Sequence, residues 1–207
     1  MVTVTYSDSL KVEYLGLFFK CTIRPIKLAS VNTAVNRISA QSLQYTAIAK
    51  AVGTMPWIVV GGIHYMESNC NFHKHLHNGD PLTGRTTHIP SGRPPLPLMP
   101  PFTFEQSAID ALTLRGFDKW HDWSIEGILW MLESYNGLGY RQFHPSVLSP
   151  YLWAGTNLYS KGKYTMDGKF SPIAVSQQLG AAAILKRAMQ LGFWNAESKK
   201  PLSTGTP

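Results

Sequence analysis

The sequence predicts a mainly α-helical protein of the α+β class, with one small β-hairpin. Apolar residues recur at spacings of three and four through several long segments, which is the period of an α-helix. One segment, residues 73–89, instead alternates, is rich in threonine and contains Asn78-Gly79, the strongest short hairpin signal. The proline-rich residues 90–101 fit neither element and are predicted to form an extended connector.

Helices are predicted first in the N-terminal part of the chain. Residues 6–21 carry an apolar stripe, and residues 29–52 carry another, within which Ser42 marks either a bend or the start of a second helix. Residues 55–67 are apolar on most sides, so this helix is expected in the core. Its Gly61-Gly62 pair weakens a helix and indicates that another backbone packs close by.

The later helices are predicted from their first and last residues. Thr103 followed by Gln106 is a capping box, and Ser171-Pro172 is a typical helix start. Residues 144–164 are aromatic and irregular. The predicted helices are residues 103–116, a helix from Asp122 or Ser124 to Asn136, and residues 171–192.

Length and composition favour one globular domain at residues 1–194, with residues 1–45 as helical support and residues 195–207 as a loose tail. Hydrophobic residues make up 44% of the 207 and charged residues 15%, which excludes a disordered protein. The formal net charge of +7 attracts polyanions such as nucleic acid, an anionic membrane or an anionic cell wall, and the scattered basic residues decide little among these. No basic helix face stands out, so nucleic acid is not an expected partner. A monomer is expected.

The cysteines and the N-terminus indicate where the protein is made. Cys21 and Cys70 give no disulfide framework, and two reduced thiols are expected. Residues 1–20 lack the features of a secretory signal, and the apolar residues 14–19 are too few to cross a bilayer. We therefore expect synthesis in the cytoplasm, no stable membrane insertion, and delivery by another component to any substrate outside.

Glu67 is the first candidate for chemistry, because the composition changes abruptly there. The helix before it is apolar, whereas Ser68 and Asn69 after it favour helix ends and turns. A carboxyl at the rim of a core is half desolvated, which raises its pKa and suits it to act as a general acid. The alternative is that Glu67 caps its helix or pairs with Lys74 or Arg85.

Asp80 and Thr86 lie in the predicted hairpin and are the second pair of catalytic candidates. A helix end followed by a hairpin brings Glu67 and Asp80 into one cleft. Two acids across a cleft suit hydrolysis of a glycosidic bond, since the leaving oxygen needs a proton and the oxocarbenium-like carbon needs a nucleophile or an activated water. The alternative for Asp80 is ordinary turn chemistry within Asn-Gly-Asp-Pro.

Four blocks carry a resemblance to a known family. They are Glu67-Ser68 at a helix end, HLHNGDPLTGRT in the predicted hairpin, YNGLGY beginning at Tyr135, and SPYLWAGTN beginning at Ser149. In this order they resemble the lysozyme-like superfamily, especially goose-type lysozymes, lytic transglycosylases and endolysins of phage and prophage. The resemblance covers roughly residues 45–165. It implies a lysozyme-like helical domain with a hairpin beside the cleft, Glu67 as general acid, and Tyr135 and Asn136 in the sugar subsites.

The departures from that family shape the expected reaction. The Gly-Leu-Met-Gln block of typical lytic transglycosylases is absent, so hydrolysis is expected. The spacing of Asp80 and Thr86 is similar to that in phage lysozymes, where such residues position the attacking water. The resemblance thus implies a phage- or prophage-encoded muramidase that cleaves peptidoglycan between N-acetylmuramic acid and N-acetylglucosamine. It needs no cofactor, and it reaches the wall through a holin or on a virion.

Substrate contacts are expected from the aromatic and polar residues of these blocks. Flat aromatic faces suit sugar rings, and asparagines suit the N-acetyl amides. The alternative for each aromatic residue is a place in the core. The substrate-binding candidates are Ser68, His77, Tyr135, Asn136, Tyr140, Trp153 and Asn157, with Tyr151 and Tyr159 as further aromatic faces.

The histidines are weighed separately. His73, His75 and His77 alternate near Cys70, but this spacing matches no standard zinc site, so no metal is expected. The favoured alternative is that His75 or His77 packs in the hairpin and forms a hydrogen bond near the cleft. His64 precedes Glu67 by one helical turn, and a core histidine is favoured over a group that tunes the acid.

Two classes of function therefore stay open. The first is a peptidoglycan glycosidase, with a lytic transglycosylase or a chitinase-like enzyme of the same fold as its variants. The second is a protein without turnover. It is either a cell-wall-binding or phage structural module, or an adaptor built on a zinc-stabilised hairpin.

Overall fold

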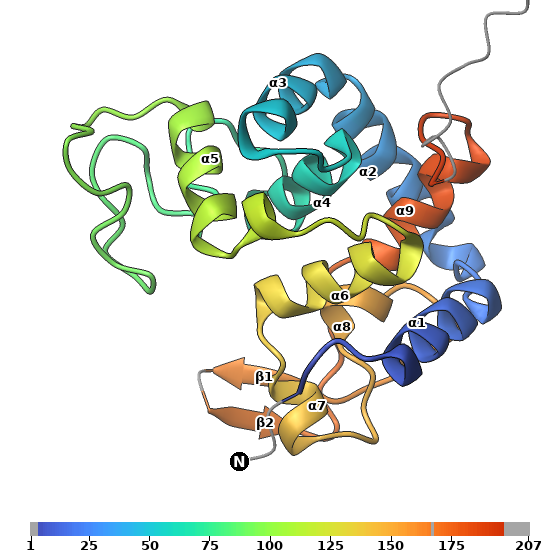
Figure 1. Cartoon of the computed structure of the whole chain (residues 1–207). Helices are drawn as coiled ribbons and strands as arrows, with labels where there is room; N and C mark the ends of the chain where they lie inside the picture. The colour runs from blue at the N-terminus through green and yellow to red at the C-terminus, as the bar shows by residue number, and fades with distance from the viewer. Residues whose placement is uncertain (1–3, 167, 197–207) are drawn as a thin grey trace, which may run out of the picture.

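The computed structural model describes residues 4–166 and 168–196. Helices dominate it, and the only sheet among these residues has two antiparallel strands (Figure 1). The predicted mainly α, α+β class is confirmed. In chain order the elements are α1 (Asp8–Lys20), η1 (Pro25–Lys27), α2 (Leu28–Ser39), α3 (Ser42–Val52), α4 (Trp57–Ser68), α5 (Phe104–Leu114), η2 (Phe117–Lys119), α6 (Ile125–Asn136), α7 (Gly139–Phe143), α8 (Pro150–Trp153), β1 (Lys163–Met166), β2 (Lys169–Ser171) and α9 (Ala181–Gln190).

The core is built around α4. This helix packs against α2, α3, α6 and α9, and the side chains of Ile58, Val59, Val60 and Ile63 are fully buried. A helix that is hydrophobic on all sides belongs in such a place, so the core position predicted for residues 55–67 is confirmed. No single described helix is long and apolar enough to span a membrane; α3 and α4 meet that criterion only as a pair bent by 107°.

Gly61 lets neighbouring side chains approach α4 closely. A Cβ atom at this position would lie 2.5 Å from Cγ2 of Ile38 in α2 and 3.0 Å from ring carbons of Tyr45 in α3. The prediction of a close neighbour is therefore right, but the neighbours are side chains and not a backbone. Gly62 has open space at the same position, with nothing within 4 Å.

Most helix boundaries follow their local signals. Thr103 forms the predicted capping box with Gln106, and Ser124 accepts a hydrogen bond from the Gly127 N–H at the start of α6. Ser42 begins a second helix, because residues 40–41 interrupt the helical conformation between α2 and α3. The first helix, α1, lies within the predicted residues 6–21.

The hairpin predicted at residues 73–89 is wrong. This segment contains one isolated antiparallel bridge, Lys74 to Pro81, and no strand. The turn itself forms, with Gly79 at φ +79° and its N–H bonded to the His75 carbonyl at 2.9 Å. The described sheet lies instead at β1 and β2; it begins in the last two residues of the segment expected to be irregular and continues beyond it.

Polar side chains explain why no strands form in residues 73–89. His75 contacts Ser107 of α5 through Nδ1 at 2.9 Å and the Gly84 carbonyl through Nε2 at 2.8 Å. Asp80 and Thr86 bond to backbone groups of the same loop. Such side-chain bonds to the backbone compete with a ladder and hold the chain in turns.

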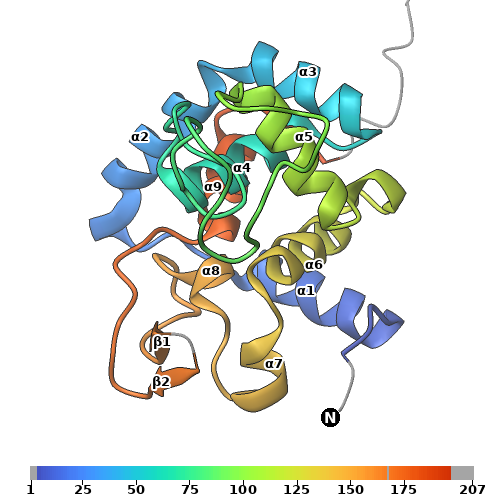
Figure 2. The same ribbon diagram turned by 90° about the vertical axis from the view of Figure 1, so that its left-hand side faces the viewer.

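The last helix begins later than predicted. Ser171 belongs to β2, and α9 starts at Ala181, so residues 172–180 form a connecting strap. In Figure 2 this strap runs along one side of the molecule from the sheet to α9. A Cβ atom at Gly180 would lie 2.3 Å from the Leu152 carbonyl oxygen, so the strap passes closely over α8 before the helix can begin. Of the predicted tail, residues 197–207 lie outside the described residues.

The elements surround the end of α4 from several sides. The long loop between α4 and α5 projects on the side of the molecule opposite α9 (Figure 1). The sheet lies with α7 and α8 beyond α6, and the strap returns from it toward α4 and α9 (Figures 1 and 2). The C-terminal end of α4 therefore lies between the loop, the strap and α8, where the candidate site is found.

Candidate active site

Glu67 lies in the last turn of α4, and the residues after it end the helix. Asn69 adopts the left-handed conformation, with φ 55°, and its N–H bonds to the Tyr65 carbonyl at 2.9 Å. The Ser68 hydroxyl donates to the His64 carbonyl at 3.3 Å and accepts from the Asn71 N–H at 3.3 Å. The polar sequence that predicts a helix end thus fixes the acid at the rim of the core.

The environment of Glu67 shifts its protonation. Its side chain is half-buried, and Oε1 accepts a hydrogen bond from the Tyr151 hydroxyl at 3.1 Å. Burial raises the pKa of Glu67 to about 7, while the Tyr151 hydrogen bond and the charge of Arg115 oppose this rise. Near neutral pH the carboxyl therefore exists in both forms, so it can give and take a proton.

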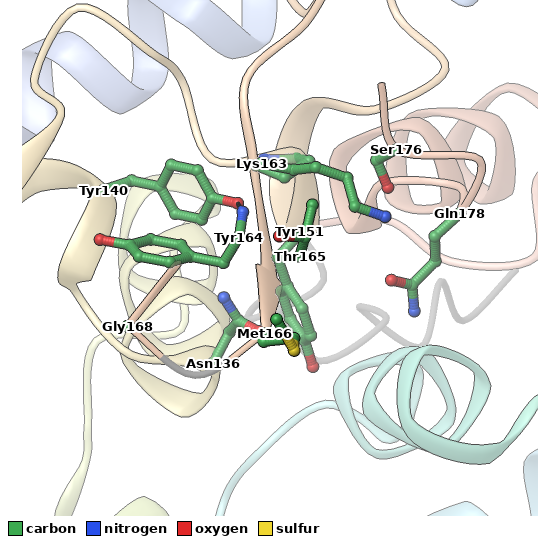
Figure 3. A pocket seen from close by; sticks show the side chains of 11 residues that line it. Asn136, Tyr140, Tyr151, Lys163, Tyr164, Thr165, Met166, Gly168, Ser176 and Gln178 are labelled. Atoms are coloured by element: carbon green, nitrogen blue, oxygen red, sulfur yellow. Dashed lines mark hydrogen bonds between the residues drawn. The ribbon is translucent and has the colours of Figure 1, made fainter. Parts of the chain in front are cut away.

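Tyr151 lines one of two neighbouring pockets, and its hydrogen-bond partner Glu67 lines the other. We name the first the tyrosine pocket; it has a volume of about 460 Å³ and is lined by Asn136, Tyr140, Pro150, Tyr151, Lys163, Tyr164, Thr165, Met166, Gly168, Ser176 and Gln178 (Figure 3). We name the second the lysine pocket; it has a volume of about 510 Å³ and is lined by Lys27, Ser30, Tyr65, Met66, Glu67, Ser68, Asn69, Lys74, Gln177, Gln178 and Leu179.

Two side chains connect these pockets. Gln178 lines both, and its Nε2 donates to the Met66 carbonyl at 2.6 Å, next to Glu67 in the chain. Tyr151 lines the tyrosine pocket and donates to Glu67, which lines the lysine pocket. Glu67 is the only carboxylate among the described residues that line either pocket.

The tyrosine pocket contains two of the predicted substrate contacts. Asn136 at the end of α6 is exposed, and Tyr140 of α7 packs edge-on against Tyr164 with ring centres 5.2 Å apart. Figure 3 shows these three side chains on one side, Ser176 and Gln178 on the other, and Tyr151 between them. Aromatic faces beside amides and hydroxyls suit a sugar chain.

Tyr135 has a structural place and lines neither pocket. Its ring is buried, and its hydroxyl donates to the Leu76 carbonyl at 2.8 Å, which fastens the loop after α4 to α6. Burial, followed by the nearby Glu67 charge, holds the pKa of Tyr135 well above its usual range. Tyr135 is thus a neutral neighbour of the acid and not the sugar contact that was expected.

Trp153 and Asn157 do not belong to the site. Trp153 is fully buried in the core. Asn157 accepts from the Thr22 N–H at 2.8 Å and donates to the Lys20 carbonyl at 3.2 Å, so it fastens the C-terminal end of α1. These two residues therefore have structural roles, Trp153 in the core and Asn157 at the end of α1.

Asp80 lines neither pocket and is bonded within its own loop. Its carboxylate accepts from the Thr87 N–H at 2.8 Å, the His88 N–H at 3.0 Å and His88 Nδ1 at 2.7 Å. Although burial acts to raise it, the pKa of Asp80 is held well below its usual range by these donors. Asp80 is an ionised group that organises its own loop, as the turn-chemistry alternative predicts.

Thr86 is also used within the loop. Its buried hydroxyl donates to the Pro90 carbonyl at 2.5 Å and accepts from the Arg93 N–H at 2.9 Å. Like Asp80, it lines neither pocket. The pair expected to position an attacking water therefore stabilises the loop, because the predicted hairpin that would have brought it to the cleft does not form.

His77 holds the same loop against α5. Its Nε2 contacts Asp110 at 2.8 Å, and Arg93 pairs with the same carboxylate. Burial lowers the pKa of His77 to about 4, although Asp110 acts in the other direction. Because Ser107, 3.4 Å from His77 Nδ1, is fully buried, this Ser-His-Asp arrangement has no access for a substrate.

The remaining polar candidates have structural places. Both ring nitrogens of His75 are bonded to protein atoms, and no three His, Cys, Asp or Glu side chains among the described residues could hold a metal ion. His64 is buried against Phe104, with ring centres 4.0 Å apart, and burial lowers its pKa to about 4, as the core alternative predicts. Cys21 and Cys70 are free thiols, as expected.

Several site residues escape a reading of the sequence. Tyr151 is recognisable as an aromatic face, but not as the partner of Glu67, from which it is separated by 84 residues. Gln178 and Lys27 carry no local signal, because strap and loop residues reach the site only through the fold.

In comparisons with known proteins, the chain matches no family model, no curated protein and no solved structure.

Proposed function

We propose that this protein cleaves glycosidic bonds of peptidoglycan glycan strands, with Glu67 as the general acid. The observation that carries the proposal is a single carboxyl with a raised pKa, which lines the lysine pocket and accepts a hydrogen bond from Tyr151 of the tyrosine pocket. A raised carboxyl pKa keeps a proton available for a leaving oxygen at neutral pH. The likeness of the sequence blocks to the lysozyme-like superfamily supports the same chemistry.

In the proposed reaction Glu67 first donates a proton and later accepts one. Glu67 donates its proton to the glycosidic oxygen as the bond to the anomeric carbon breaks, which leaves an oxocarbenium-like sugar and a carboxylate. The Tyr151 hydroxyl, 3.1 Å away, donates to that carboxylate and stabilises it. Glu67 then takes a proton from the nucleophile that attacks the anomeric carbon, and the carboxyl is restored.

The tyrosine pocket is the proposed sugar site. Tyr164 offers a partly exposed aromatic ring and Asn136 an exposed amide for an N-acetyl group, while Tyr140 and Tyr151, each only 6% exposed, form the wall of the pocket. The net charge of +7 favours capture by an anionic wall. In this proposal the protein is a phage or prophage product that reaches the wall through a holin or on a virion.

A second candidate is a lytic transglycosylase, in which a hydroxyl of the sugar itself is the nucleophile. One observation favours it over hydrolysis: no second carboxylate lines either pocket among the described residues, and Asp80 and Thr86 are bonded within their loop. An internal hydroxyl needs only Glu67, which acts first as acid and then as base. Hydrolysis needs a water held near the same carboxylate.

The test is lysis of purified walls, followed by turbidity. We expect Glu67→Gln to lower the rate by at least about 100-fold, because glutamine cannot donate the proton. Glu126→Gln, the same change at a residue that lines neither pocket, is the matched control and should keep full activity. Lysis by Glu67→Gln at the native rate would remove Glu67 from the mechanism.

The products decide between the two candidates. Mass analysis of the released glycans should show a reducing end after hydrolysis and an anhydro end after transglycosylation. Native protein that binds walls and leaves their turbidity unchanged would instead support a module without turnover.

A further inference from the structure

The lysine pocket differs chemically from the tyrosine pocket. It has one aromatic residue, Tyr65, where the tyrosine pocket has three. Two lysines, Lys27 from η1 and Lys74 from the loop after α4, line it together with the hydroxyls of Ser30 and Ser68. A pocket of this composition suits an anionic group better than the face of a sugar ring.

The two ammonium groups are not neutralised by the protein. Within residues 4–166 and 168–196, no carboxylate oxygen lies within 4.0 Å of either lysine nitrogen. The stem of Lys27 is half-buried and passes over Gly155, where a Cβ atom would lie 3.8 Å from Lys27 Cγ. The only acid in the lining is Glu67, which burial keeps partly neutral. The pocket therefore carries uncompensated positive charge.

We infer that the lysine pocket is a carboxylate-binding subsite that takes the acidic substituent of a muramic acid residue. The inference rests on the proposed function, since it assigns the pocket beside the proton donor to one part of the same glycan. N-acetylmuramic acid differs from N-acetylglucosamine by a lactyl group, which ends in a carboxylate or continues into a peptide with its own carboxylates. Lys27 and Lys74 would pair with that charge, and the hydroxyl of Ser30 would donate to it.

This subsite makes the two pockets bind different parts of the glycan. Sugar rings would occupy the tyrosine pocket, which Tyr151 connects to Glu67, and the charged substituent would occupy the lysine pocket, which Glu67 itself lines. A neutral chitin strand fills only the tyrosine pocket, so it should bind more weakly. Lysine is a point charge on a flexible stem, so the subsite can accept either the lactyl carboxylate or a peptide carboxylate without a fixed bidentate geometry.

Binding to the Glu67→Gln protein tests the inference without turnover. Calorimetry would compare three tetrasaccharides: neutral N-acetylglucosamine, N-acetylglucosamine alternating with peptide-free N-acetylmuramic acid, and the same alternating chain with its peptides. We expect at least one anionic form to bind about ten-fold more tightly than the neutral one, with the advantage lost at high salt. Whichever anionic form binds more tightly identifies the source of the carboxylate.

Removal of the lysines should abolish that preference. In E67Q/K27Q/K74Q the ratio of affinities for anionic and neutral tetrasaccharides should fall below about two-fold. E67Q/K50Q/K119Q removes the same number of charges at exposed positions outside both pockets, and it should keep the preference. Equal unfolding temperatures of the two variants would show that both are folded.

Three results would overturn the inference: equal affinity for neutral and anionic forms, a preference that survives loss of both lysines, or no binding of any tetrasaccharide. The proposed function is judged separately by wall lysis with the native chain. A protein that lyses walls without a preference for carboxylate loses only the subsite. One that prefers the anionic forms and never lyses walls keeps the subsite and loses the enzyme.

Discussion

Glu67 owes its protonation to its immediate neighbours. Burial at the end of α4 favours the neutral carboxyl, whereas the Tyr151 hydroxyl and the Arg115 charge favour the carboxylate. The balance gives a pKa of about 7. A general acid works only while it is protonated, so activity should fall as the pH rises through this value.

Tyr151→Phe should move that decline to higher pH. The substitution removes the hydrogen bond that stabilises the carboxylate, so the pKa of Glu67 rises further. A bond to a charged group is strong enough to move the alkaline limb by about one pH unit. The measurement is the pH dependence of wall lysis for both proteins. An unchanged limb would mean that Glu67 does not control it.

The predicted site residues that line the two pockets are mainly those with local sequence signals. Glu67 stands at an abrupt change from apolar to polar residues, Asn136 is the last residue of a helix that Gly137 ends, and Tyr140 follows shortly after it. Gln178 could not be found in this way, because it reaches the Met66 carbonyl across 112 residues. Asp80 was assigned to the cleft because its loop was expected to be a hairpin.

Among the elements, helices were predictable because their period and their caps lie in consecutive residues. The sheet was not predictable, because the sequence contains two hairpin signals and only one of them is flanked by strands. Asn78-Gly79 forms its turn, yet the residues around it bond to α5 and to their own loop. Asp167-Gly168 is a signal of the same kind, and β1 and β2 flank it. A turn signal fixes a reversal, while the contacts of the flanking side chains decide whether strands form.

The glycine pair of α4 offers a matched test of packing. Gly61→Ala should lower the free energy of unfolding by about 1–3 kcal/mol, because its methyl group would meet Ile38 at 2.5 Å. Gly62→Ala meets nothing within 4 Å and should raise it by up to about 1 kcal/mol through helix propensity. Urea unfolding of both variants measures the difference, and equal effects would contradict the packing around α4.

At the scale of the whole molecule, α1 is joined to the helices near the site by a buried polar cluster. Glu133 of α6 accepts from the Tyr14 hydroxyl of α1 at 2.5 Å and from Arg141 Nε of α7 at 2.9 Å. Arg141 also pairs with Glu13 at the surface, at 3.0 Å. Tyr14 thus connects α1 to residues of α6 and α7 that lie more than 100 positions away in the sequence.

Glu133→Gln should destabilise the protein strongly. It leaves the Arg141 charge without its buried partner, which costs about 3 kcal/mol. Glu13→Gln removes the other carboxylate from the same arginine at a position 43% exposed, and it should cost less than about 1 kcal/mol. Denaturant unfolding of the two variants compares them directly. A cost for Glu13→Gln equal to that for Glu133→Gln would show that burial does not govern this cluster.

Gln178 has a consequence for how long a ligand must be. Gln178 lines both pockets and is bonded to the Met66 carbonyl beside Glu67, so a ligand that extends from one pocket into the other is expected to contact this side chain. A long polymer would contact both pockets at once. A fragment short enough to occupy a single pocket would make fewer contacts, and its orientation relative to Glu67 would not be fixed.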